Sequence, residues 1–433
     1  MCKSVGIYDE RQYIICQSKA VLSLQKKILL ALAAFLIFQA IANLIKYFLE
    51  LRDGGNFGAD FIVFWHAGQH VYQKQFLNFY DTALWQKILN NQSLYTAYPF
   101  QPFAYPPTIA LLLWPLGTLS YNTAVALWTV IPLILYYALL FLFVKPTLRD
   151  TDKTTRNYIY LLVAASMLPA ISANMFTGQI GTWMGVLFLG FFYYERRYPV
   201  IAGLCIGLIA IKPQLTPLLP FALIASSRWR IILTAACLII TMIVVTTAWL
   251  SIPIWADYMH MSVIFSGLIN NNAHWIGKLA PGPYIALHGL GVPVSLAITI
   301  QGIISLVAVA AIIQVYRDKN SNQNIRQALL AAGILLVPPY SMCYDTPILA
   351  VALLPLLAYA WQKGLDNLLE VIAVMAIIIM PYAQPLLYKI NIPFGTLSLL
   401  LLFAALYRKY INEKRGGNTA YAFSTASSTL SSS

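Results

Sequence analysis

Apolar runs recur along almost the whole chain and are separated by short polar gaps. In hydrocarbon every backbone amide needs a partner within its own segment, and the alternation of a lipid-facing strand is absent, so these runs predict helices. The first run extends from about Ile28 to Leu49, long enough for the ~30 Å hydrocarbon core of a bilayer. The pattern therefore predicts an all-α polytopic membrane protein.

About twelve transmembrane helices are predicted when every long apolar run is counted as one crossing. They cover residues 28–49, 121–144, 157–173, 181–194, 199–211, 214–226, 230–250, 290–316, 328–341, 346–361, 368–384 and 394–407. The run from Pro106 to Leu116 is short and bounded by prolines, so we expect a half-helix or a re-entrant segment there.

A long polar segment follows the first predicted span. Residues 50–104 are too polar to cross but rich in aromatic residues, and they predict a first outer loop with interfacial helices near residues 61–73 and 82–91. Residues 1–415 are expected to form a single transmembrane domain. The Ser/Thr/Gly-rich residues 416–433 are predicted to be a disordered cytoplasmic tail.

Composition and charge agree with a membrane protein. Hydrophobic residues make up 59% of the chain and charged residues only 10%, against about 25% charged residues in soluble domains. A net charge of +13 could indicate nucleic acid, but 21 of the 28 Lys and Arg residues lie in the segments predicted to be inside. This bias predicts cytoplasmic N- and C-termini for a multi-pass membrane protein, and no nucleic-acid partner.

The cysteine and histidine residues give little sign of a metal site. The five cysteines have no C-x-x-C spacing, so neither a metal site nor a disulfide framework is predicted. His66 and His70 would share a helix face, as metal ligands can, but no third ligand is evident, and an interfacial polar face is the alternative. We therefore predict no metal and no cofactor.

Lys212 is the most unusual charged residue in the predicted topology. It follows an uninterrupted apolar stretch and is placed at the outer face, against the positive-inside trend. A cation in this position could hold a phosphate or pair with a carboxylate. The alternative is an interfacial lysine that snorkels from a helix end into water.

Asp60 also lies at the predicted outer face, directly before an apolar helix-like stretch. A carboxylate among apolar and aromatic residues could act as a general base. It could equally be the N-cap of the helix that begins at Phe61.

Other polar residues are predicted at the same face. The segment between Ser251 and Pro283 contains His274 among several Asn and Trp residues, which could bind a sugar through hydrogen bonds and ring stacking, although interfacial Trp is common without a ligand. Short polar motifs also end or join predicted spans there: Gly178-Gln179, Lys212-Pro213-Gln214 and Tyr344-Asp345.

A series of short motifs extends over most of the chain. In order, they are Gly58-Ala59-Asp60-Phe61, Phe79-Tyr80-Asp81, Tyr105-Pro106-Pro107, Trp114-Pro115-Leu116, Gly178-Gln179, Ala202-Gly203-Leu204, Lys212-Pro213-Gln214, and Pro339-Tyr340 through Tyr344-Asp345. Their order and spacing resemble those of the polyprenol-phosphate-sugar-dependent glycosyltransferases of family 87, membrane enzymes with the C-type glycosyltransferase architecture.

The resemblance implies that a mannose-like or other hexose or pentose is moved, with inversion, from a polyprenyl-phosphate donor to a lipid or glycan acceptor. It places this reaction at the outer face of a bacterial plasma (inner) membrane. It implies that Asp60 is the catalytic base and that Lys212 binds the donor phosphate. The remaining candidates for substrate binding are Tyr105, Gln179, Gln214, His274, Tyr344 and Asp345. The donor is already activated, so no divalent metal is required.

Two other functions remain open. A transporter or flippase for a lipid-linked or anionic substrate could use Lys212 and Asp60 to bind or gate instead of to catalyse. A structural subunit of a membrane complex would need no chemistry. We find no internal repeat of the kind that many secondary transporters carry, which weakly favours the enzyme.

Overall fold

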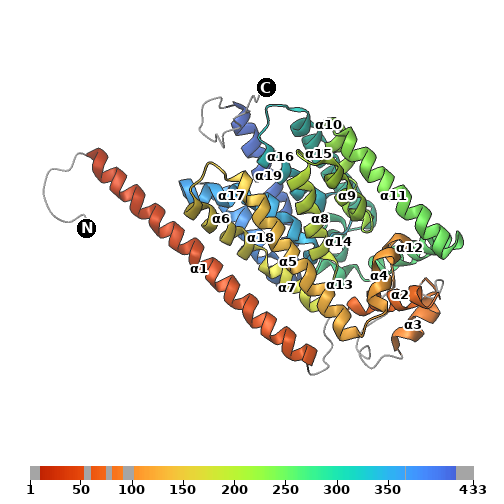
Figure 1. Ribbon diagram of the computed structural model, residues 1–433. Coiled ribbons are helices and arrows are strands. Elements are labelled where there is room, and N and C mark those ends of the chain that lie inside the picture. The colour runs from red at the N-terminus through yellow and green to blue at the C-terminus, as the bar shows by residue number, and fades with distance from the viewer. Residues whose placement is uncertain (1–9, 53–59, 75–79, 91–101, 366, 416–433) are drawn as a thin grey trace, which may run out of the picture.

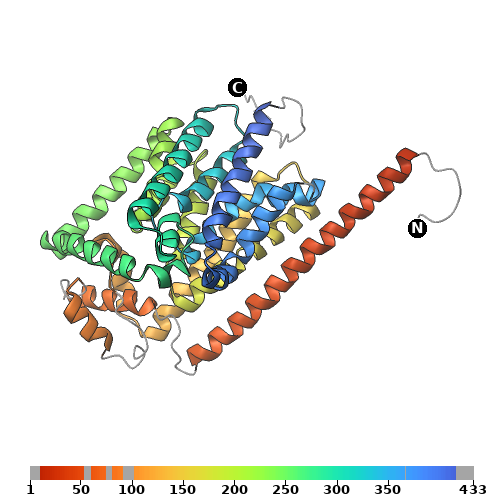
Figure 2. The same ribbon diagram turned by 180° about the vertical axis from the view of Figure 1, so that it is seen from behind.

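The computed structural model describes residues 10–52, 60–74, 80–90, 102–365 and 367–415 (Figures 1 and 2). These residues form helices joined by turns, with no strand among them. The chain is therefore all-helical over the described residues, as the apolar runs predicted. Gly58, Ala59 and Phe79 of the motifs lie outside the described residues, and so does the tail at residues 416–433.

Seven helices of the described residues are long and apolar enough to cross a membrane. They are α1 (Glu10–Arg52), α5 (Tyr121–Thr147), α11 (Trp229–Leu250), α15 (Val294–Arg317), α17 (Ala350–Lys363) with the preceding η4 (Cys343–Leu349), α18 (Leu368–Leu387) and α19 (Phe394–Arg415). An eighth is added if α6 (Lys153–Ser166) and α7 (Leu168–Thr177), which are bent by 40° at their junction, form one span.

Large apolar side chains cover the outward faces of several of these helices. Phe38 of α1 is 72% exposed and Leu306 of α15 is 71% exposed. Many other large apolar side chains on α1, α11 and α15 are also exposed. Such an extended apolar surface is not stable in water. It fits a bundle surrounded by lipid, so the protein is a multi-pass membrane protein.

Four further helices at predicted crossings are short. They are α8 (Gly181–Tyr194), α9 (Pro199–Ile209), α10 (Leu219–Ala225) and α16 (Gln323–Leu336). The longest of them have 14 residues and so extend over about 21 Å, less than the ~30 Å hydrocarbon core. The prediction of twelve crossings is therefore not confirmed.

The centre of the bundle consists of α8, α16, η4 and α17, which are buried on nearly all sides. The long helix α1 runs along one edge and packs against α6 and α7 (Figure 1). Its buried residues Leu29, Ala33 and Leu36 recur every three to four positions and form one face.

One end of the bundle, which we call the loop end, carries most of the helices that connect the long ones. These are α2 (Phe61–Tyr72), α3 (Thr82–Asn90), η2 (Pro107–Ile109), α4 (Ala110–Gly117), η3 (Pro213–Leu215), α12 (Pro253–Asn271), α13 (Ala273–Gly277), α14 (Pro283–Gly289) and η5 (Tyr388–Ile390). The two helices predicted in the first loop are present as α2 and α3, and the predicted half-helix is present as η2 and α4.

The packing of α2 differs from the predicted interfacial helix. Nine of its 12 residues are buried, mainly against α4. His66 and His70 are both buried, so they do not form an interfacial polar face. No group of three or more His, Cys, Asp or Glu side chains that could hold a metal is found among the described residues.

The opposite end of the bundle, which we call the basic end, is where α1 begins and α19 ends (Figure 1). There the ammonium of Lys26 lies 5.2 Å from the centre of the Trp361 ring, and Lys414 lies 3.7 Å from a carboxylate oxygen of Asp318. These contacts bring together segments that the sequence placed on one side of the membrane.

Candidate functional site

Asp60 lies directly before α2 and is held by the end of α7. Its backbone N–H donates to the carbonyl oxygen of Thr177 at 2.9 Å. Its side chain forms no cap hydrogen bond to α2; instead, one carboxylate oxygen accepts a hydrogen bond from Nε2 of Gln179 at 2.7 Å. The N-cap interpretation is therefore wrong, and the carboxylate is turned toward the connection between α7 and α8.

A left-handed glycine shapes this connection. Gly178 ends α7 with φ of 72°, a conformation that glycine adopts without strain. Its carbonyl oxygen accepts a hydrogen bond from the indole N–H of Trp128 at 2.9 Å. The turn directs Gln179 toward Asp60, while Oε1 of Gln179 is buried with no hydrogen-bond partner among the described residues. That oxygen is an acceptor beside the carboxylate.

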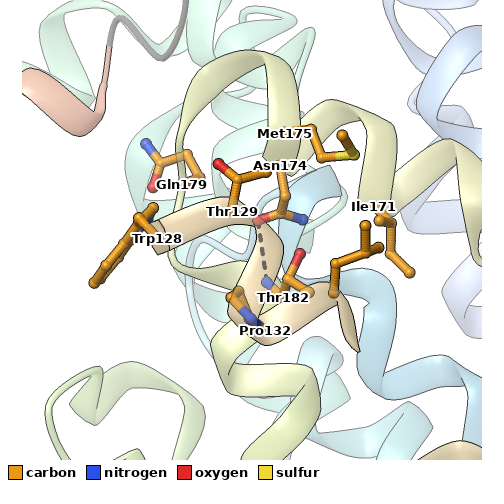
Figure 3. A pocket seen from close by; sticks show the side chains of 9 residues that line it. Trp128, Thr129, Pro132, Ile171, Asn174, Met175, Gln179 and Thr182 are labelled. Carbon is orange, nitrogen blue, oxygen red and sulfur yellow. Dashed lines mark hydrogen bonds between the residues drawn. The ribbon is translucent and has the colours of Figure 1, made fainter. Parts of the chain in front are cut away.

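Gln179 also lines a narrow pocket (Figure 3). The pocket is bounded by Trp128, Thr129, Pro132, Leu133, Ile171, Asn174, Met175, Gln179 and Thr182. Its volume is about 10 Å³, which holds about one water molecule or hydroxyl group.

Asn174 joins this pocket to η4. Its Oδ1 accepts from the backbone N–H of Thr182 at 3.2 Å, and its Nδ2 donates to the carbonyl oxygen of Tyr344 at 2.7 Å. A side chain in place of Gly181 would collide with the same carbonyl. The connection between α7 and α8 and the start of η4 are thus packed backbone to backbone.

Lys212 follows α9 and is buried, with only 2% of its surface exposed. Its ammonium forms an ion pair with the carboxylate of Asp345 and lies 4.8 Å from the centre of the Tyr344 ring. A lysine that snorkels would reach water, and Lys212 does not, so that alternative is wrong. The ammonium has three donors, of which Asp345 accepts one.

Asp345 is engaged through both carboxylate oxygens. One accepts from Lys212 and the other from the backbone N–H of Met342 at 3.1 Å. The sequence indicated both Lys212 and Asp345 as candidates but not their contact, which joins positions 133 residues apart. Because both of its oxygens accept hydrogen bonds, Asp345 is better suited to position Lys212 than to take a proton.

Tyr105 is a tyrosine on which the charges of both carboxylates act. Burial raises the pKa of Tyr105 well above its usual range, and the negative charges of Asp345 and Asp60 raise it further. Both carboxylates therefore act on one phenol, which stays protonated and able to donate a hydrogen bond. Its backbone is fixed by the hydroxyl of Tyr80, which donates to the carbonyl oxygen of Tyr105 at 2.6 Å.

Two of the predicted substrate-binding residues, His274 and Gln214, form no hydrogen bond with the other candidate residues in the described part of the chain. His274 is exposed, and its contacts are the carbonyl oxygen of Gly289 at 3.0 Å and the ring of Tyr388, neither of which belongs to the site. Gln214 lies in η3 beside Lys212 and is half-buried, and its side chain has no hydrogen bond within the described part of the chain. The structure adds Asn174 to the candidate residues of the site. This buried amide lies inside an apolar run, and a polar residue in such a run could have indicated it from the sequence.

Fold and site together define an all-helical membrane protein that has a buried lysine–aspartate pair and a second, hydrogen-bonded carboxylate at one end of its bundle. The sequence profile of glycosyltransferase family 87 matches residues 103–339, more than half of the chain. The chain belongs to this family, and the protein is a membrane glycosyltransferase. No curated protein and no solved structure matches it.

The matched region contains some of the candidate residues but not all. Tyr105, Gln179 and Lys212 lie within it, whereas Asp60 and Asp345 lie outside. The importance of these two carboxylates therefore rests on their contacts.

Gln179 is expected to position Asp60, and its role can be tested by two substitutions. Gln179→Leu removes the donor to the carboxylate and should lower kcat about 10-fold or more, the size expected for one hydrogen bond to a charged group. Gln179→Glu places a like charge beside Asp60, which disfavours its ionised form, so the acid limb of the pH–rate profile should move to higher pH. Rates measured across pH give both results.

Gln314→Leu is the matched control, since it removes an exposed glutamine that accepts a hydrogen bond from Tyr407 near the basic end. It should leave the rate and the profile unchanged. An unaltered profile in Gln179→Glu would show that Gln179 does not act through Asp60.

Proposed function

We propose that the protein transfers a sugar from a polyprenyl-phosphate donor to a hydroxyl group of a lipid or glycan acceptor, at the outer face of a bacterial plasma membrane. The observation that carries the proposal is the arrangement of Asp60, which is not a helix cap and is held by Gln179 near Tyr105. The charge of Asp345, which forms an ion pair with Lys212, also raises the pKa of Tyr105. Membership of the family supports glycosyl transfer.

The reaction needs one base and one cation. As the acceptor oxygen attacks the anomeric carbon, its proton passes to Asp60 and the bond between the anomeric carbon and the phosphate oxygen breaks. The lipid phosphate leaves with an additional negative charge, which the free donors of Lys212 stabilise. A single displacement of this kind inverts the anomeric centre.

Neighbouring groups orient the reactants. The hydroxyl of Tyr105 donates a hydrogen bond to a phosphate or sugar oxygen, and the free Oε1 of Gln179 accepts one from a sugar hydroxyl. Asp345 keeps the ammonium of Lys212 in place between substrates. The sugar is already joined to a phosphate leaving group, so the proposal needs no metal or organic cofactor.

The orientation is proposed from the distribution of charge. The segments predicted to be inside hold 21 of the 28 Lys and Arg residues, and the described parts of these segments lie at the basic end (Figure 1). Segments rich in Lys and Arg remain in the cytoplasm. On this orientation both termini are cytoplasmic, and the site at the loop end faces the periplasm or the exterior.

Thiol labelling tests the orientation. Single cysteines at Asn271, which is exposed at the loop end, and at Asn320, which is exposed at the basic end, are introduced into a chain whose five cysteines have been replaced. In intact cells an impermeant maleimide should label residue 271 only, and after permeabilisation it should label both. Labelling of residue 320 alone in intact cells would reverse the orientation.

A transporter or flippase is the second candidate, and one assay separates it from the enzyme. The purified protein in detergent is given a panel of short-chain polyprenyl phosphates, each carrying one radiolabelled sugar, together with membrane lipids from cells that lack the protein. We expect labelled acceptor and free polyprenyl phosphate to form, because transfer needs no sealed compartment. Movement of lipid-linked sugar in sealed vesicles, with no transfer in detergent, would support the transporter.

A further inference from the structure

The charges of three arginines act on one buried carboxylate, Glu195, at the basic end of the bundle. Glu195 follows α8 and is buried, Arg228 directly precedes α11, and Arg326 lies in the second turn of α16. Arg196 comes next to Glu195 in the chain. The cluster therefore combines residues from three separate segments and has an excess of positive charge.

Arg326 is a buried member of the cluster whose guanidinium lacks hydrogen-bond acceptors in the described part of the chain. It is 7% exposed, and its guanidinium lies 5.2 Å from the centre of the Tyr316 ring. No hydrogen-bond acceptor contacts it within the described residues, and its Nε is completely buried. A guanidinium has five donors, and leaving buried donors without an acceptor is unfavourable.

Glu195 does not neutralise this arginine by contact. Its carboxylate accepts hydrogen bonds from the side-chain amides of Gln327 at 2.9 Å and Gln323 at 3.4 Å, and it forms no ion pair within 4.0 Å among the described residues. Burial raises the pKa of Glu195, and the charges of Arg326, Arg228 and Arg196 oppose that rise. Its acceptors are thus already occupied by neutral amides.

The arginines also act on one another. Arg196 is exposed at the surface, and partial desolvation and the charge of Arg326 lower its pKa, with a smaller lowering by Arg228, while the charge of Glu195 raises it. The starts of α11 and α16 add positive dipole ends on the same side. One buried carboxylate is thus set against the charges of three arginines, and an additional anion would be stabilised beside them.

Exposed aromatic residues flank the cluster. Trp229 follows Arg228 and is 55% exposed, and Tyr198 follows the arginines after α8 and is 56% exposed. Exposed Trp and Tyr next to Arg are typical of the depth at which lipid headgroups lie. Basic pockets between membrane helices bind the phosphates of such headgroups.

We propose that Arg326, Arg228 and Arg196 bind a phosphate group, supplied by the headgroup of an anionic membrane lipid. Arginine forms paired hydrogen bonds with phosphate oxygens, which would satisfy the donors of Arg326. This site is separate from the one at Asp60 and does not depend on the proposed sugar transfer.

Native mass spectrometry of the full chain in detergent tests the proposal. Phosphatidylglycerol, phosphatidylcholine and inorganic phosphate are titrated separately, and the wild type should bind phosphatidylglycerol more tightly than phosphatidylcholine. Arg326→Gln and Arg228→Gln should each weaken phosphatidylglycerol binding about tenfold or more, the size expected when a charge-assisted hydrogen bond is lost. Arg228 is only half-buried, so its variant is informative even if Arg326→Gln fails to fold.

Arg317→Gln is the matched control, because Arg317 is exposed at the same end, at the last residue of α15. It should change binding by less than about twofold, as expected for an exposed charge. If Arg317→Gln weakens phosphatidylglycerol binding as much as the cluster variants do, general surface charge explains the binding and the proposed site is overturned. Equal binding of phosphatidylglycerol and phosphatidylcholine, with no binding of inorganic phosphate, would also overturn it. Binding of inorganic phosphate that both cluster variants weaken, with no preference for phosphatidylglycerol, would support the phosphate site but overturn its lipid source.

Discussion

Asp60→Asn is expected to slow sugar transfer at least about a hundredfold, within the range of about 10²- to 10⁴-fold for loss of general base catalysis. The amide keeps the shape of the carboxylate and an oxygen that can accept from Gln179, but it cannot take the proton of the acceptor. Expression, membrane insertion and donor binding should therefore stay close to those of the wild type. Single-turnover rates and donor titrations of the purified variant separate the chemical step from binding.

Asp81→Asn is the control for this experiment, because Asp81 is a true helix cap. Its carboxylate accepts from the backbone N–H groups of Ala83 and Leu84, both at 3.0 Å. This variant should transfer sugar at nearly the wild-type rate. Near wild-type turnover in Asp60→Asn would exclude Asp60 as the base and would move attention to Asp257 of α12.

The pair of Lys212 and Asp345 is expected to show a stability effect and an activity effect that can be separated. Lys212→Met or Asp345→Leu alone leaves one buried charge unpaired and should destabilise the protein by about 3–5 kcal/mol. The double variant removes both charges and should recover most of that stability. It should still be inactive, because no cation remains for the leaving phosphate. Thermal unfolding midpoints in detergent and transfer rates provide the two readouts.

A second buried pair offers the control for this experiment. At the basic end Lys409 lies 3.0 Å from a carboxylate oxygen of Glu370, and both side chains are largely buried. The double variant Lys409→Met with Glu370→Leu should keep its transfer activity. Wild-type activity in the Lys212→Met, Asp345→Leu variant would show that the first pair is purely structural.

The presence of most helices could be predicted from the sequence, but their lengths and their packing could be predicted less well. The range 181–194 predicted from apolar residues coincides with α8, whereas the predicted crossing at 214–226 shortens to α10. Pro217 and Pro220 lie in that run and Pro213 directly precedes it, and each proline removes a backbone donor and restricts its neighbours. Apolar composition alone cannot show where such a helix begins.

The site could be predicted in part, because an ionisable residue in an apolar environment is conspicuous. Lys212 and Asp60 were found in this way. Gln179 and Asp345 were also among the candidates, but their contacts with Asp60 and Lys212 were not predicted, since these contacts join distant positions that only the packing of α7, α8 and η4 brings together. The burial of His66 and His70 was missed for the same reason, because it depends on how α2 packs against α4.

The central claim is that Asp60 takes the acceptor proton while the acceptor displaces the lipid phosphate in one step. The anomeric configuration of the transferred sugar tests it most directly, by NMR of the product formed by the purified protein from a donor of defined configuration. A single displacement predicts a product of opposite configuration. A product with retained configuration would require two displacements or attack from the side of the leaving phosphate, and would contradict a single in-line displacement with Asp60 as the base.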